Sequence, residues 1–333
     1  MMTMIKRRTF VRACLGAGAL LTRPGQAALR PDLHWQSRAL VGFGTTLSFQ
    51  AAHENEALLT RALDAAVAAQ RRIETQMSLF DAYSALSRLN RDGVLDAPPS
   101  ELLEILQLSR AVSARSGGAF DVTVQPLWAA YATAQAQGRL PTPSEVAAAR
   151  GRVDWRALEV APRRLRFRGA GMGATLNGIA QGYAADRVRR VLAAHGIRHA
   201  LIDAGEYSTL GHNAHDQPWA LAVADPRHEA AYVARLLADG RCLATSADDQ
   251  TSFSADHRYH HIFDPHTGYS PPELAGVTVA APSGALADAL TKVMFVAGVE
   301  GSLRLAKVWG VDVLLIDKAG RVRATAGMPI AKG

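Results

Sequence analysis

The sequence is poor in cysteine, which limits how the chain can be held together. Only Cys14 and Cys242 occur among 333 residues. Cys14 falls in an N-terminal segment that we expect to be removed, so the mature chain would keep one thiol and form no intramolecular disulfide. The charged Arg12 just before Cys14 disfavours a lipoprotein cleavage site there. The remaining residues, roughly 300, must be held by their apolar core, and they suffice for one large domain or two intimate ones.

The sequence also lacks long apolar runs and long basic runs. The stretch Ala13–Leu21 is short and interrupted by glycine, whereas a membrane span requires about 20 apolar residues. We therefore expect no membrane span. Later basic runs are no longer than a doublet such as Arg163-Arg164, and the net charge of +7 falls to +2 without residues 1–27. Nothing in this pattern indicates nucleic-acid binding.

The first 27 residues have the features of an export signal. Arg7 and Arg8 precede the short apolar run, and the small residues around Ala27 suit cleavage after that position. The paired arginines favour twin-arginine export of a folded protein and so predict a periplasmic location. A frayed basic N-terminus with a short helix is the alternative interpretation. We therefore divide the chain into a cleaved signal, 1–27, and a single domain, 28–333.

The periodicity of apolar residues predicts an α+β fold with mixed sheets, because strands and helices mix without a strict βαβ rhythm. Strands are expected at 39–49, 163–168, 200–202, 219–224, 276–281 and 311–316. Helices are expected at 55–77 with Asn55 as cap, at 102–114, after a capping box at 142–145, at 178–195, at 286–297 and at 301–308. The segment 204–216 is expected to be irregular.

Two blocks in the first half of the chain combine glycine with aromatic and polar residues. The first comprises Gly42–Thr45 (GFGT), Met77–Asp81 (MSLFD) and Ser84–Asn90 (SALSRLN), which taken alone would fit ordinary surface structure. The second is Gly117–Trp128 (GGAFDVTVQPLW). Its glycines permit close approach of a ligand, and Asp121 could accept hydrogen bonds from a nucleotide. Tight packing of a strand into a turn is the alternative.

The third block, Thr175–Arg187 (TLNGIAQGYAADR), reads as a glycine-containing turn that enters a helix. Such a turn presents free backbone N–H groups and the positive end of the helix dipole to an anion, and it therefore suits a pyrophosphate.

The fourth block, Tyr259–Gly268 (YHHIFDPHTG), carries three histidines and continues into Val277–Val279 and Ala287–Leu290. Adjacent histidines on a strand point to opposite faces, so His260 and His261 are not expected to bind one zinc ion. We expect His261 to face the site, where it would orient a pyrophosphate or carry a proton. His260 is expected to be a partly exposed strand residue.

In this order the four blocks resemble the motifs of the ApbE family of flavin transferases, from Gly42 to Gly298. The resemblance implies an ApbE-like, T-fold-like architecture. It implies transfer of FMN from FAD to a Ser or Thr hydroxyl of a target protein, with release of AMP and with Mg²⁺ as metal. An exported enzyme would act on a periplasmic or membrane redox protein.

The same resemblance assigns residue roles by motif position. FAD contacts are expected at Phe43, Phe80, Ala119, Phe120, Asp121, Thr175, Gln181, Gly205 and His261. His261 and Asp264 are expected to act in catalysis, and Gly178 and Asp288 to bind magnesium. A hydroxyl ligand of the family is replaced here by Lys292, with Thr291 as a substitute that points about 100° away on a helix.

Several other positions depart from the family pattern. Thr175 replaces an aspartate, Asn177 a glycine, Gln181 a lysine, and Glu206 the second glycine of another motif. Lys292 would form an ordinary helix ion pair with Asp288, or place its ammonium where the metal would lie. We therefore expect magnesium to bind weakly or not at all. Loss of transfer, leaving a flavin-binding or carrier protein, and hydrolysis of FAD to FMN and AMP are the alternative functions.

Overall fold

The computed structural model describes residues 11–13 and 32–332. The predicted signal therefore lies outside the described residues, except for Val11–Ala13. The helices are α1 (Glu56–Met77), α2 (Ala85–Asp92), α3 (Ser100–Arg115), α4 (Gln125–Ala136), α5 (Pro143–Arg150), α6 (Ala180–Ala194) and α7 (Gly284–Trp309), with 3₁₀ turns at Val122–Val124 and Trp155–Ala157. The strands are β1 (Val11–Ala13), β2 (His34–Gly42), β3 (Thr45–His53), β4 (Val94–Asp96), β5 (Leu158–Ala161), β6 (Arg164–Phe167), β7 (His199–Asp203), β8 (Tyr207–Leu210), β9 (Ala220–Ala224), β10 (Tyr232–Leu237), β11 (Cys242–Ala247), β12 (Leu274–Ala281), β13 (Asp312–Asp317) and β14 (Val322–Ala324).

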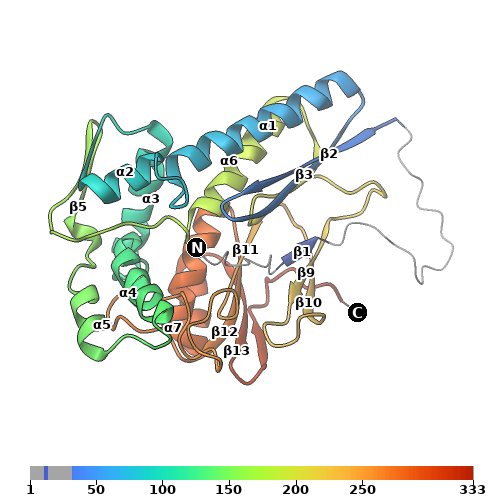
Figure 1. Cartoon of the computed structure of the whole chain (residues 1–333). Coiled ribbons are helices and arrows are strands. Elements are labelled where there is room, and N and C mark those ends of the chain that lie inside the picture. Colours follow the sequence, from blue (N-terminus) through green and yellow to red (C-terminus); the bar gives the residue numbers. More distant parts are fainter. Residues whose placement is uncertain (1–10, 14–31, 333) are drawn as a thin grey trace.

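An eight-stranded sheet with the order β14-β13-β12-β11-β8-β7-β3-β2 forms the centre of the molecule (Figure 1). Smaller sheets have the orders β1-β9-β10 and β4-β6-β5. The predicted α+β class is confirmed. Every strand pairing among the described residues is antiparallel, so the expected mixture of strand directions is not found.

The strand expected at 39–49 is instead a hairpin formed by β2 and β3. Its turn is Phe43-Gly44, where both residues have positive φ angles of 49° and 76°. Two left-handed residues between antiparallel strands make a tight turn that matches the strand twist. Apolar character continues through the turn, since Phe43 is buried, and this hid the reversal in the sequence.

The predicted helix caps are present in the structure. The Asn55 side chain accepts from Leu58 N at 2.9 Å, and the capping box of Thr142 with Glu145 is formed. The two helices expected after residue 285 are joined as α7 across a kink at Gly298. Helix α4 was missed, because its first turn lies in the second block, which suggested a strand and a turn. The expected irregular segment at 204–216 contains β8.

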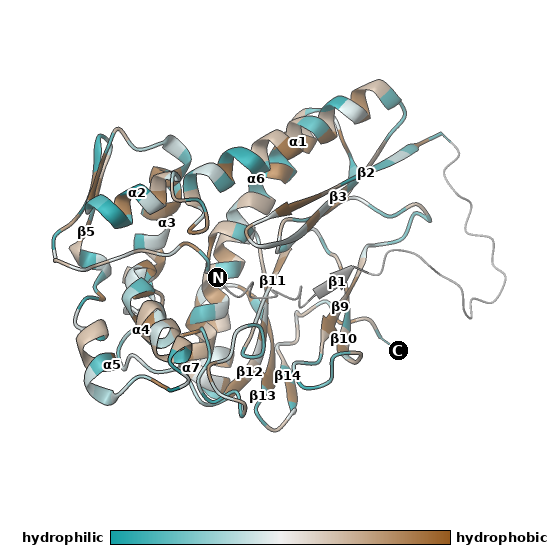
Figure 2. Ribbon diagram, in the orientation of Figure 1, coloured by the Kyte–Doolittle hydropathy of each residue, from teal (hydrophilic) through white to brown (hydrophobic). Residues whose placement is uncertain are grey.

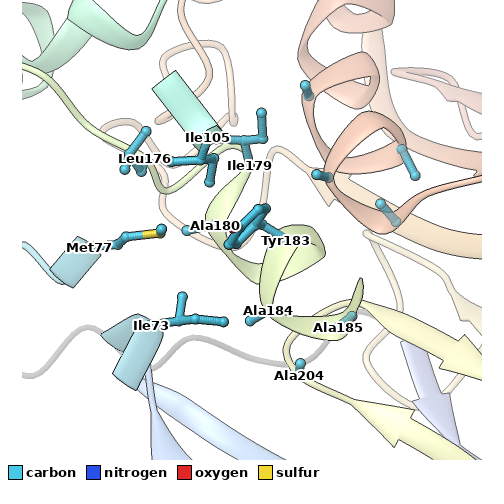
Figure 3. Close-up of a cluster of buried hydrophobic side chains, with 14 of the residues drawn as sticks. Ile73, Met77, Ile105, Leu176, Ile179, Ala180, Tyr183, Ala184, Ala185 and Ala204 are labelled. Atoms are coloured by element: carbon cyan, nitrogen blue, oxygen red, sulfur yellow. The ribbon is translucent and has the colours of Figure 1, made fainter. Parts of the chain in front are cut away.

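Helix α6 lies at the centre of the largest apolar cluster. Figure 3 shows Ile73 and Met77 of α1 and Ile105 of α3 around the α6 residues Tyr183 and Ala184. All five side chains are no more than 2% exposed. Figure 2 shows hydrophobic residues on the strands beside α1 and both residue classes along α1 itself. The start of α6 is therefore held in place by packing on several sides.

Helices α6 and α7 touch through their backbones. A Cβ atom on Gly182 would lie 2.0 Å from the Gly284 carbonyl oxygen, so only glycine fits at this position. The Asp186 carboxylate accepts from Gly284 N at 2.7 Å and from Ala285 N at 3.0 Å. A carboxylate there satisfies free N–H groups and complements the helix dipole of α7.

None of the helices in the described part of the chain is long and apolar enough to cross a membrane.

Candidate functional site

The first three sequence blocks meet at the turn before α6. Asn90 of the first block donates to the Ala174 carbonyl at 2.8 Å and accepts from Ala174 N at 2.7 Å. Thr175 N donates to the Val122 carbonyl of the second block at 2.7 Å. Thr175 Oγ1 accepts from Asn177 N at 3.2 Å and so shapes the turn. Residues far apart in the sequence therefore hold the glycine-containing turn.

The fourth block closes the arrangement from the other side. The His266 ring hydrogen-bonds through Nε2 to the Gly117 carbonyl at 3.0 Å, which links it to the second block. This bond, assisted by Asp264, raises the pKa of His266. Asp288 on α7 accepts through Oδ2 from Gly182 N of α6 at 3.2 Å. All four blocks that were separated along the chain are thus in contact.

Lys292 lies against the glycine turn and binds Asp288. Its Nζ is 2.5 Å from Asp288 Oδ1 and 3.2 Å from the Asp288 carbonyl oxygen. A Cβ atom on Gly178 would approach Lys292 Cε at 3.1 Å and a ring carbon of Phe120 at 3.5 Å. The lysine stem therefore lies between the turn and α7, with its ammonium on a carboxylate that is 1% exposed.

The residues present do not fit a magnesium ion. Both carboxylate oxygens of Asp288 are engaged, by Lys292 and by Gly182 N. Thr291 is buried, donates to the Asp288 carbonyl at 2.6 Å and pairs with Ser246 Oγ at 2.7 Å, so it is no substitute ligand as arranged. An ammonium and a divalent cation about 4 Å apart repel by about 8 kcal/mol at an effective dielectric near 20. Lys292 forms the expected helix ion pair with Asp288, and its ammonium thereby lies at the carboxylate that the family motif assigns to the metal.

Glu206, which the sequence identified only as a departure from the family pattern, is a member of this charged cluster. It is 5% exposed and accepts through Oε2 from Thr245 N at 2.9 Å. Burial, together with the nearby Asp288 carboxylate, raises the pKa of Glu206 well above its ordinary value, and the Lys292 ammonium opposes that rise. Glu206 and Lys292 are both departures from the family pattern and have opposite charges, which was the available signal that they interact.

Two predicted FAD contacts, Gln181 and Gly205, lie against each other. A Cβ atom on Gly205 would be 2.4 Å from Gln181 Nε2, and Gly205 has a φ of 95°. The Gln181 amide thus covers this glycine at the start of α6. It supplies hydrogen-bonding groups where the family pattern has a positive charge.

Two predicted acidic residues already have protein partners. Asp121 accepts from Thr123 N, Thr123 Oγ1 and Trp155 N at 2.7, 2.6 and 3.0 Å, and burial raises its pKa. Asp264 accepts from the backbone and ring nitrogens of His266, both at 2.9 Å. In the structure both carboxylates shape loops. Their assignments to FAD binding and to catalysis stay predictions.

The two adjacent histidines have different surroundings, as expected, but they lie in a loop with one isolated bridge at His260 rather than in a regular strand. His260 was expected to be partly exposed, and this was wrong: it is fully buried against Phe295, and burial lowers its pKa to about 4. His261 is half-buried, with Nδ1 3.2 Å from the Thr251 carbonyl. His261 is therefore the member of the pair that a ligand can reach.

The two phenylalanines of the first block differ in accessibility. Phe43 is 4% exposed and its N–H donates to Glu74 Oε1 at 2.9 Å, so its ring belongs to the core. Phe80 is 59% exposed, and its ring lies over the hairpin turn, 3.5 Å from a Cβ placed on Gly44. Phe80 can offer a ring face to a planar ligand. Ala119, beside the buried Phe120, is half-buried.

Comparison with known proteins identifies the family. A family model described as the ApbE family matches residues 43–315. FAD:protein FMN transferases from Salmonella typhimurium and Treponema pallidum are 31% and 30% identical to this chain, over 75% and 74% of it and 77% and 74% of those proteins. The apo structure of flavinyl transferase ApbE from Pseudomonas stutzeri superposes with a TM-score of 0.74 at 27% identity, covering 88% of this chain and 95% of that one. An ApbE protein from Thermotoga maritima, at 24% identity and a TM-score of 0.78, shares the fold over 88% of this chain and 97% of its own. The chain belongs to the ApbE family.

Proposed function

We propose that the protein is an FAD:protein FMN transferase that modifies a Ser or Thr hydroxyl of a protein acceptor. The observation that carries the proposal is that the four family blocks contact one another around the segment that leads into α6. Lys292 lies against Gly178 of this turn, and α6, which carries Gln181, starts directly after it. The positive end of a helix dipole and a cation are a suitable environment for the pyrophosphate of FAD.

The reaction exchanges the phosphoanhydride bond of FAD for a phosphate ester bond to the acceptor. The acceptor oxygen forms a bond to the phosphorus of the FMN half, the bond from that phosphorus to the AMP oxygen breaks, and AMP leaves with the electron pair. The acceptor hydroxyl loses its proton in the same process. This chain contributes positioning and positive charge, the main sources of acceleration in phosphoryl transfer.

His261 is proposed to receive the hydroxyl proton. A neutral ring that donates from Nδ1 to the Thr251 carbonyl carries its lone pair on Nε2, which is the state that a proton acceptor requires. Asp264, which anchors His266 in the same loop, is proposed to hold that loop in position. We derive no step through magnesium, because Asp288 is engaged by Lys292 and Gly182, and Thr291 by Ser246.

The departures at Gln181, Glu206 and Lys292 favour a second candidate, a flavin-binding accessory protein without transfer activity. Incubating the mature protein with FAD and a candidate acceptor, followed by mass spectrometry, separates the functions. An acceptor heavier by one FMN indicates transfer, free FMN indicates hydrolysis, and intact FAD indicates binding alone. His261→Gln should reduce transfer at least roughly a hundredfold if it acts as the base, whereas the exposed His215→Gln serves as the control.

The proposal includes export. The Arg7-Arg8 pair and the small residues of a cleavage site around Ala27 support removal of residues 1–27 and twin-arginine transport to the periplasm. The acceptor would then be a periplasmic or membrane redox protein. Fractionation of cells that produce the full chain tests this: mature protein that starts near Ala28 belongs in the periplasmic fraction, and a full-length cytoplasmic protein would contradict export.

A further inference from the structure

The part of the site where the family motif places the metal, around Asp288, contains the positive charge of Lys292. The Lys292 ammonium contacts two oxygens of Asp288, at 2.5 and 3.2 Å, and is thereby bound at the carboxylate that the family motif assigns to the metal. Its side chain is 20% exposed, whereas that of Asp288 is 1% exposed. The ammonium therefore lies between the buried carboxylate and the outside.

The surrounding structure holds the lysine in this position. Gly178 leaves room for its stem, because a side chain there would start 3.1 Å from Lys292 Cε. Gly182 N holds the second Asp288 oxygen at 3.2 Å, and Asp186 holds the first turn of α7 against α6. The lysine is therefore fixed by packing and by charge on elements that themselves cannot shift independently.

Glu206 adds a second acidic group on the side of β11. Glu206 is buried and accepts a hydrogen bond from Thr245 N. The charges of Asp288 and Lys292 both act on its carboxyl group. A single ammonium among two acidic groups is electrostatically favourable, whereas a lysine with no counter-charge would be costly to bury. Glu206 and Lys292 thus belong to one charged arrangement.

We propose that Lys292 replaces the divalent metal in this protein, so that the phosphate-binding site works without magnesium. The ammonium is bound to the Asp288 carboxylate and directs its remaining N–H groups toward the glycine turn. There it would donate a hydrogen bond to a phosphate oxygen of the bound dinucleotide. Lys292 is thus a ligand-binding residue and Glu206 a positioning residue. The inference rests on the proposed function for the identity of the dinucleotide, FAD, but not for the absence of a magnesium site.

The first test measures Mg²⁺ binding to the purified mature protein by calorimetry, without FAD. Wild type should give no binding heat at millimolar MgCl₂, whereas Lys292→Thr should bind Mg²⁺, because the substitution removes the ammonium and adds a hydroxyl ligand. Lys307→Thr, an exposed lysine on the same helix, is the matched control and should behave as wild type. Equal Mg²⁺ binding by wild type and Lys292→Thr would overturn the inference.

The second test measures FAD affinity by quenching of flavin fluorescence, in EDTA and in MgCl₂. Wild-type affinity should be the same in both. Lys292→Met keeps the apolar stem and should weaken binding at least roughly tenfold in both, the usual effect of losing a hydrogen bond to a charged group. Lys292→Thr should bind weakly in EDTA and recover in MgCl₂.

Two outcomes of the second test contradict the inference: a wild-type affinity that rises at least roughly tenfold on adding MgCl₂, or an unchanged affinity in Lys292→Met. A wild type that binds no FAD in either buffer contradicts the flavin function instead, and the Mg²⁺ titration then decides the metal question by itself. Circular dichroism of each variant shows that a lost affinity is not a lost fold. Glu206→Gln should weaken FAD binding less than Lys292→Met, because Glu206 acts through the lysine.

Discussion

The close contact between α6 and α7 makes Gly182 the most sensitive small residue near the site. In Gly182→Ala the new methyl group would start 2.0 Å from the Gly284 carbonyl oxygen and 2.4 Å from the Gly284 carbonyl carbon. Both atoms belong to the backbone, so no rotamer change relieves the clash. The helices must separate by at least roughly 1 Å to reach ordinary van der Waals distances.

The expected cost of Gly182→Ala is about 2–4 kcal/mol in the free energy of unfolding. Forced insertion into a packed interior costs about 1–3 kcal/mol, and weakening the hydrogen bonds across α6 and α7 adds to it. The higher helix propensity of alanine offsets about 1 kcal/mol of this. For a domain of this size each kcal/mol shifts the melting temperature by about 2–4 °C, so a decrease of roughly 5–15 °C is expected.

Thermal unfolding followed by circular dichroism tests this value, with Gly151→Ala as the control. A Cβ on Gly151 would make only ordinary van der Waals contact, 3.6 Å from its nearest neighbour, and the φ of −60° at Gly151 suits alanine. The control should be neutral or slightly stabilising, by about 0.4–1 kcal/mol. If Gly182→Ala has the same melting temperature as Gly151→Ala, the backbones of α6 and α7 are not in close contact at Gly182 and the prediction is refuted.

Three further predictions concern the flavin contact, pH dependence and export. Phe80→Ala should weaken FAD binding by about 1–3 kcal/mol if the exposed ring stacks on the flavin; Tyr83→Ala, which removes another exposed ring, is the control, and equal affinities in fluorescence titration would remove Phe80 from the site. Burial raises the pKa of Asp203 to about 6, so the folded state binds this proton more tightly than the unfolded chain does. The contribution of this proton to the free energy of unfolding is therefore present below the ordinary carboxyl pKa and is lost as the pH rises through about 6. Urea unfolding at several pH values should show wild type losing stability relative to Asp203→Asn across this window, by about 2–3 kcal/mol at neutral pH, and a pH-independent difference would contradict the assignment. Replacing Arg7 and Arg8 by lysine should retain the protein in the cytoplasm, and normal periplasmic accumulation of that variant would contradict twin-arginine export.

Local signals in the sequence were sufficient for the α+β class, the family and the starts of several helices. Asn55 and the capping box at Thr142 each act through hydrogen bonds within a single helical turn, so neighbouring residues alone determine them. The four blocks were recognisable for the same reason, because each is a continuous segment. The hairpin at Phe43-Gly44 was not recognised, since its apolar pattern continues through the reversal.

The composition of the site was decided only by the tertiary structure. Spacing on a helix showed that Lys292 could reach Asp288, but not whether it turned inward or outward; packing against Gly178 settled that. Glu206 lies 86 residues before Lys292 in the sequence. Glu206 is buried close to Lys292 because β8, which follows Glu206, pairs with β11. Local physics determines a turn or a cap, whereas the charge a carboxylate faces depends on which distant segments fold against it.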